Sequence, residues 1–125
     1  VYPGALHTRF EHSIGTLHLT QRLIDAVNLN FELSPSTCLS VSAEETRLIR
    51  MAALLHDVTH IPFGHNIEDQ SGLLERHDSP GRFEGLLAPR RSLGRKLGEL
   101  GLVGDVGRIL LPLDHPGRAG VPPYW

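Results

Sequence analysis

The first quarter of the chain carries apolar residues at helical spacing. From Thr8 to about Leu29 there is no proline and only one glycine, and the apolar positions that recur on one helical face are Ile14, Leu17, Ile24 and Val27. This pattern predicts an amphipathic helix. Residues 30–41 lose the periodicity and contain a serine–proline–serine run, so they predict a loop.

A second helix is predicted from about Ala43 to Asp57. Ser42 and Glu45 have the S-x-x-E spacing of a capping box, in which each residue bonds the backbone N–H of the other. The apolar positions of this segment form a second stripe: Leu48, Met51, Ala52 and Leu55. A helix with such a stripe must bury it, and the first helix offers a matching one, so the two helices are expected to pack together.

Proline and glycine divide the remaining chain into short helical segments. Pro62 interrupts the helical pattern, and a helical turn is expected to resume over about residues 65–70. Ser79 followed by Pro80 predicts an N-cap and a first helical residue, with the helix running to about Leu87. Two further short helices are expected over about 93–100 and 103–111. No segment alternates with a period of two, so the sequence predicts an all-α fold.

Composition limits the classes of function. A chain of 125 residues that is 40% hydrophobic has room for one domain with one core. A net charge of -2 argues against binding nucleic acid by bulk electrostatics. The single cysteine, Cys38, excludes an internal disulfide framework and fits a reducing compartment. With no long apolar run and no signal-peptide layout at the N-terminus, the sequence predicts a cytoplasmic protein without a membrane partner.

Histidines and acidic residues cluster in the middle of the chain. Four of the eight histidines fall within 22 residues, His56, His60, His65 and His77, and beside them stand Asp57, Glu68, Asp69 and Asp78. Imidazole and carboxylate together suit divalent ions such as zinc, manganese, iron or nickel, whereas calcium prefers oxygen ligands alone. A metal site is therefore the leading physical interpretation.

The adjacent pair His56 and Asp57 lies at the end of the second predicted helix. Neighbouring residues diverge by about 100° around a helix, so an open last turn would help both side chains reach one ion. Taken alone, the pair is equally compatible with a surface position, where an imidazolium suits the helix dipole.

Two longer motifs resemble those of a known family. Residues 8–15 (TRFEHSIG) and 53–65 (ALLHDVTHIPFGH) closely resemble the HD-domain superfamily, and within it the branch of dGTPases and SAM-and-HD-domain deoxynucleoside triphosphate triphosphohydrolases. Residues 2–5 (YPGA) and 77–78 (HD) also look like that branch, so the resemblance covers about residues 2–88. It implies an HD-domain helical bundle, with residues 1–125 as a single domain that ends before the last metal ligand.

The resemblance assigns three metal ligands, His12, His56 and Asp57. Without it, His12 would be an ordinary polar position on an amphipathic helix. The fourth ligand of the family is an aspartate in an Asp-Arg-Leu-Asp-Tyr-like segment, and neither Asp105 nor Asp114 stands in a matching context. The expected site therefore has three protein ligands, with Mn, Fe, Zn, Ni or Mg as the candidate ions.

The resemblance also implies residues that handle protons. His60 is similar to the active-site histidine that follows the HD pair in the family. His65 and Glu68, three residues apart, could together face a phosphate and its attacking water. His65 is the candidate general acid, since a group with a pKa near 6.5 can donate a proton near neutral pH.

Two residues are assigned to substrate binding. His77 resembles a substrate-pocket histidine, and Arg9 is a candidate phosphate clamp because a guanidinium matches phosphate oxygens. A surface position at the start of a helix is the alternative for Arg9. His7, His18 and His115 have no motif around them and are expected to be exposed.

These assignments predict a metal-dependent phosphohydrolase that in its intact form cleaves a deoxynucleoside triphosphate to deoxynucleoside and triphosphate. The expected partner is then a nucleotide, and the sequence leaves open whether the chain forms a homo-oligomer. The alternative, favoured by the missing aspartate, is an inactive HD-domain remnant that binds a nucleotide or a partner without turnover. Nucleic-acid binding through residues 90–96 is a weaker hypothesis than a solvated helix face.

Overall fold

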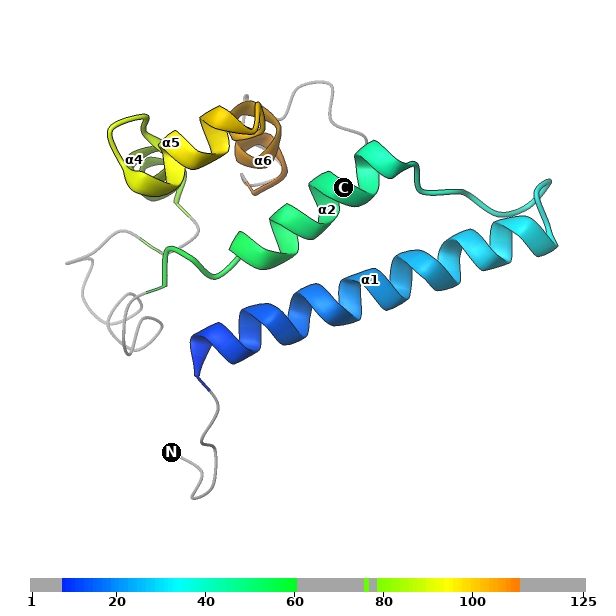
Figure 1. Cartoon of the computed structure of the whole chain (residues 1–125). Helices are drawn as coiled ribbons and strands as arrows, with labels where there is room; N and C mark the ends of the chain where they lie inside the picture. Colours follow the sequence, from blue (N-terminus) through cyan, green and yellow to red (C-terminus); the bar gives the residue numbers. More distant parts are fainter. Residues whose placement is uncertain (1–7, 61–75, 77–78, 111–125) are drawn as a thin grey trace, which may run out of the picture. The chain divides into compact units, whose positions relative to one another are not determined.

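A computed structural model describes residues 8–60, 76 and 79–110, and these contain five α-helices and no strand. The helices are α1 (Arg9–Leu33), α2 (Ala43–Leu55), α4 (Pro80–Leu87), α5 (Ser92–Glu99) and α6 (Val103–Leu110), shown in Figure 1. The predicted all-α class is confirmed. The chain folds into two compact units, one with α1 and α2 and the other with α4, α5 and α6.

Helix α1 begins at a capping box that the sequence interpretation missed. The Thr8 hydroxyl accepts a hydrogen bond from the Glu11 N–H at 3.1 Å, and the Glu11 carboxylate accepts one from the Thr8 N–H. The helix continues to Leu33, so the prediction of a loop from residue 30 was wrong by four residues. The helix ends next to Ser34, which precedes Pro35, because proline disfavours helical geometry in the residue before it.

Helix α2 begins where its capping box predicts. The Ser42 N–H donates to a Glu45 carboxylate oxygen at 2.8 Å, and the Glu45 N–H donates to the Ser42 hydroxyl at 3.2 Å. The helix ends at Leu55, two residues before its predicted end, and residues 56–59 form a turn. Consequently, His56 and Asp57 lie just beyond the last helical residue.

Helices α1 and α2 pack side by side in opposite directions, as predicted (Figure 1). Two residues of the predicted α1 stripe, Ile14 and Val27, are nevertheless exposed. The Asn28 side chain holds the connection between them, since its amide group donates to the Val41 carbonyl at 3.1 Å and its oxygen accepts from the Val41 N–H at 2.7 Å. Further along, Arg50 donates to the Gln21 side chain at 2.8 Å. The same antiparallel register brings the first turns of α1 alongside the end of α2.

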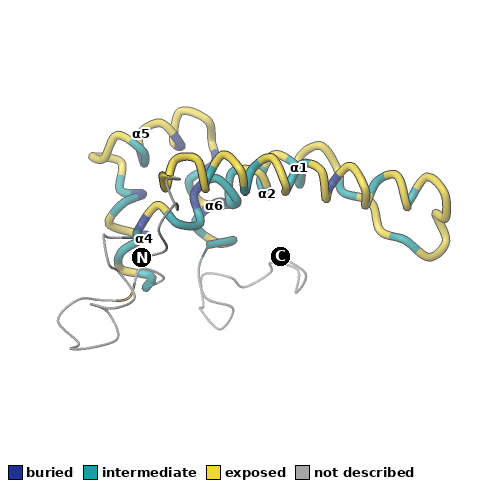
Figure 2. Tube along the Cα trace, turned by 90° about the horizontal axis from the view of Figure 1, so that it is seen from below, coloured by how far each residue is buried: buried dark blue, intermediate teal, exposed yellow. Residues whose placement is uncertain are grey.

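The unit with α4, α5 and α6 has a dense apolar core. Its buried apolar residues are Phe83, Leu87, Leu97, Leu102 and Val106. Figure 2 shows buried stretches of the backbone, in dark blue, in this unit. Ser79 caps α4 by accepting the Arg82 N–H, and Pro80 follows it, as predicted. The predicted bounds of these three helices are confirmed to within one residue. The turn expected over residues 65–70 lies outside the described residues.

Two backbone features fix how α5 meets its neighbours. A Cβ at Gly94 would collide with the carbonyl groups of Leu87 and Ala88, so only glycine fits this close approach. Gly101 has a φ of 68°, in the left-handed region that glycine tolerates. The Leu102 N–H then donates to the Leu97 carbonyl at 2.9 Å and the Gly101 N–H to the Gly98 carbonyl at 3.0 Å, which is a Schellman motif.

Candidate metal centre

His12 stands in the first turns of α1. Its backbone N–H donates to the Thr8 carbonyl at 3.0 Å, the first intrahelical bond after the cap, and the residue is exposed. The capping box therefore determines where the helix starts and on which face His12 lies. Arg9, the first residue of α1, is exposed and lies three residues earlier, on the same side of the helix.

His56, Asp57 and His60 belong to the turn that follows α2. The His60 N–H donates to the Asp57 carbonyl at 3.1 Å, which closes the turn. One carboxylate oxygen of Asp57, Oδ1, lies 3.4 Å from His56 Nε2 and 3.3 Å from His60 Nε2. The Asp57 carboxylate thus stands between two imidazoles, and the His60 side chain is buried, with 8% of its surface exposed.

The described residues include one potential metal-binding group, made of His12, His56 and Asp57. Each offers one ligand atom, and these atoms all lie within 4.8 Å of one another. His56 and Asp57 are half-buried, and His12 is exposed. Ligand atoms about 2.0–2.2 Å from one ion are separated by at most about twice that distance, so small adjustments suffice for all three to bind one ion.

The donor set fits a divalent transition ion. Two imidazole nitrogens and one carboxylate oxygen are ligands that zinc, manganese, iron and nickel accept. A three-residue set also leaves coordination positions for water or substrate, as in catalytic rather than structural metal sites. The arrangement could therefore bind a metal that acts in catalysis.

The other predicted site residues divide into two groups. Arg9 and His60 are described, and both lie on the elements that carry the three potential ligands. His65, Glu68 and His77 lie outside the described residues, so their predicted roles stay predictions. His18, which was expected to be exposed, is exposed on α1.

The basic residues of α5 follow the favoured of the two hypotheses made for them. Arg95 and Lys96 are exposed, and both donate to the Glu99 carboxylate, at 2.8 and 3.0 Å. This is an exposed network of charges three and four residues apart on one helix. It is the solvated helix face that the sequence favoured over a nucleic-acid surface.

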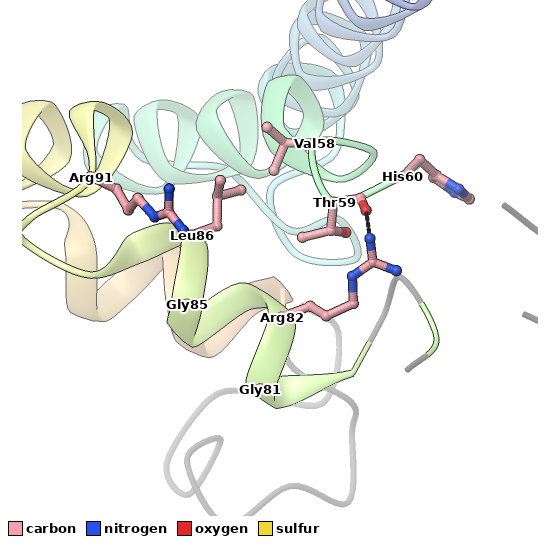
Figure 3. Close-up of a pocket in the computed structure, with 8 residues that line it drawn as sticks. All are labelled: Val58, Thr59, His60, Gly81, Arg82, Gly85, Leu86 and Arg91. Carbon is pink, nitrogen blue, oxygen red and sulfur yellow. Dashed lines mark hydrogen bonds between the residues drawn. The ribbon is translucent and has the colours of Figure 1, made fainter. Parts of the chain in front are cut away.

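A pocket of about 430 Å³ lies beside the turn that follows α2. It is lined by Val58, Thr59 and His60 of the turn, by Gly81, Arg82, Gly85 and Leu86 of α4, and by Arg91, which precedes α5 (Figure 3). Within its lining, the Arg82 guanidinium donates to the Thr59 carbonyl at 2.8 Å. The sequence interpretation did not single out Arg82, because no motif surrounds it.

Residues 9–99 match the family model of the HD domain. The chain belongs to the HD domain family. The matched region contains the three potential metal ligands and the turn that follows α2. The family resemblance inferred from residues 8–15 and 53–65 is therefore confirmed.

Individual proteins are similar to part of this chain. The chain is 41% identical over 75 residues to a deoxynucleoside triphosphate triphosphohydrolase SAMHD1 homolog of Dictyostelium discoideum, and 40% identical over 65 residues to deoxynucleoside triphosphate triphosphohydrolase SAMHD1 of Homo sapiens. These matches cover 58% and 52% of this chain. An uncharacterised protein of Methanocaldococcus jannaschii is 40% identical over 68 residues, or 54% of this chain.

The chain matches only a small part of each of these relatives, between 10% and 14% of their length. No solved structure matches the chain significantly. Among the described helices, none is both long enough and apolar enough to span a membrane.

Proposed function

We propose that this chain provides the metal-binding part of a phosphohydrolase site, with His12, His56 and Asp57 as the ligands of a divalent ion. The observation that supports the proposal is the grouping of these three ligand atoms within 4.8 Å, contributed by the start of α1 and the turn after α2. We further propose that residues 1–125 act as one HD domain, which the family match over residues 9–99 supports.

The proposed substrate is a deoxynucleoside triphosphate, cleaved to deoxynucleoside and triphosphate. The support is the activity for which the SAMHD1 relatives are named, since these share 40% or 41% identity with this chain over the matched residues. Manganese, iron, zinc or nickel fits the two imidazoles better than magnesium, which prefers oxygen ligands and retained water.

A bound divalent ion would polarise a phosphoryl oxygen and lower the pKa of its bound water. In the proposed mechanism, the chain's own residues bind and orient the substrate. Arg9, on the same side of α1 as His12, binds phosphate oxygens and stabilises charge that develops on them. His60, whose Nε2 lies 3.3 Å from the Asp57 carboxylate, gives a proton to the leaving oxygen of the substrate and regains one from the attacking water.

Titration calorimetry of the whole chain with manganese tests the proposed ligands. His12→Ala and His56→Ala should each weaken manganese affinity more than the roughly 10–100-fold that is typical for loss of an outer partner of a ligand. His18→Ala is the matched control, because His18 is an exposed histidine on the same helix as His12. Equal losses in all three variants, or no manganese binding by the unmodified chain, would refute the metal site.

A second measurement tests the reaction. Manganese-dependent release of triphosphate from dGTP should occur with the unmodified chain and the His18→Ala variant, and should be absent from His56→Ala. Manganese binding without release of triphosphate would contradict the hydrolase proposal and favour a nucleotide-binding module.

A further inference from the structure

Both polar atoms of the peptide group between Thr59 and His60 are held by hydrogen bonds. The carbonyl oxygen of Thr59 accepts a hydrogen bond from Arg82 Nη2 at 2.8 Å, shown by the dashed line in Figure 3. The N–H of His60 donates to the Asp57 carbonyl at 3.1 Å. Since a peptide group is planar, bonds at its two ends fix the orientation of the whole group.

This peptide group immediately precedes the His60 side chain. Its orientation fixes the direction of the N–Cα bond of His60, and so restricts the positions open to an imidazole whose Nε2 lies 3.3 Å from Asp57 Oδ1. The turn lies beyond the last residue of α2. The bond from Arg82 ties this turn to α4, which follows more than 20 residues later in the chain.

Arg82 donates from a well-anchored position. It is in the first turn of α4, where its own N–H is capped by Ser79, and the next residue, Phe83, has only 3% of its surface exposed. Thr59 is also buried, with 7% exposed. A hydrogen bond from a charged donor at a partly buried site is stronger than a neutral one, so Arg82 can hold the turn in one conformation.

We infer that Arg82 is a positioning residue, which acts through the Thr59 carbonyl to hold His60 against Asp57. The role of His60 in catalysis rests on the proposed function. The bond that holds the turn does not, and it can be measured in a chain that has no activity.

Amide hydrogen exchange at His60, followed by NMR, tests the inference directly. Arg82→Met keeps most of the side-chain length and removes the donor, so the His60 amide should exchange about 10-fold faster, the factor that corresponds to loss of one hydrogen bond to a charged group. Arg91→Met is the matched control, since Arg91 lines the same pocket and is exposed. The His60 amide of this control should exchange at the original rate.

The amide of Val106, a residue with 0% exposure in the core of α4, α5 and α6, reports whether that unit stays folded. Should Arg82→Met lose protection there, Arg82→Gln, which keeps a polar but shorter side chain, is expected to show the same rise at His60. An unchanged His60 rate in a folded Arg82 variant, or an equal rise in Arg91→Met, would overturn the inference. The second result would point to the charge of the pocket rather than to the bond with Thr59.

Turnover gives a second readout where the chain hydrolyses dGTP. Loss of positioning should lower kcat at least 10-fold and change KM and manganese affinity by less than about 3-fold, because the bond that is removed ends on the Thr59 carbonyl and not on a potential ligand. A rise in KM with unchanged kcat would contradict positioning. Faster His60 exchange in a chain without turnover would support the inference while the proposed function failed.

Discussion

The two units of the molecule differ in how they use their apolar residues. Helix α1 has 25 residues and buries only Ile24, and α2 has 13 residues and buries only Leu55. Helices α4, α5 and α6 have only eight residues each, yet their unit buries five apolar side chains. Leu97 and Val106 are the most deeply buried of these.

Several large apolar side chains of α1 are exposed, among them Phe10 at 74% and Leu23 at 67%. His12 lies in the first turns of the sparsely buried α1, whereas His56, Asp57 and Arg82 belong to the unit that contains the dense core. The comparison teaches that two of the three potential ligands, and the residue that we infer holds their turn, are carried by the unit with more burial of its own. Substitutions at buried and exposed positions of the two units test this difference.

The largest effect on stability is expected for Leu97→Ala, and Leu23→Ala is its exposed control. Leu97 is 1% exposed, so its truncation should lower the free energy of unfolding of its unit by about 2–5 kcal/mol. Leu23 is 67% exposed, and its truncation should change that free energy by no more than about 0.5 kcal/mol. Residue-resolved hydrogen exchange measures each unit separately, and similar losses for the two variants would refute the contrast in burial.

An intermediate effect is expected for Gly101→Ala, which alters the end of α5. The left-handed φ of 68° costs about 1–2 kcal/mol for a residue with a Cβ, and the change would weaken the Schellman motif. Gly98→Ala is the matched control, because a Cβ there meets nothing within 4 Å, and it should stabilise the helix by about 0.5–1 kcal/mol. Thermal unfolding of both variants should shift in opposite directions, and a shift in the same direction would contradict the argument.

Much of the fold could be predicted from the sequence because its helix boundaries are set by local signals. Ser42 with Glu45, and Ser79 with Pro80, bond to their own neighbours, so their pattern is complete within four residues. The error at the end of α1 arose because residues 30–33 have no breaker and only weak periodicity, and Pro35 was the real stop signal. The T-x-x-E box at Thr8 was equally visible in the sequence and was overlooked.

The site was less predictable, and the reason differs between residues. The grouping of His12, His56 and Asp57 was predicted through motifs, because spacing alone could not say that residues 44 apart in the chain lie close together. Arg82 could not be found in this way, since its partner is a backbone carbonyl, and any residue type at position 59 would supply one. Tertiary contacts of this kind become visible only once α4 and the turn are placed in one unit.

The smallest expected effect on stability concerns the capping box at the start of α2, which stabilises this sparsely buried helix locally. Ser42→Ala should lower the free energy of unfolding by about 1 kcal/mol, because it removes the acceptor for the Glu45 N–H.

The hydrogen bond from the Ser42 N–H lowers the pKa of Glu45 from its ordinary value of 4.5. Since the folded state binds this proton less readily than the unfolded state, the stabilisation is present above pH 4.5 and is lost as the pH falls through the lowered pKa. Chemical unfolding of Glu45→Gln should therefore lose part of this acid dependence, whereas Glu44→Gln, which removes a charge from the same helical turn, should retain it. Equal acid dependence in the two variants would show that the charge of the first turn, rather than the bond to Ser42, stabilises the start of α2.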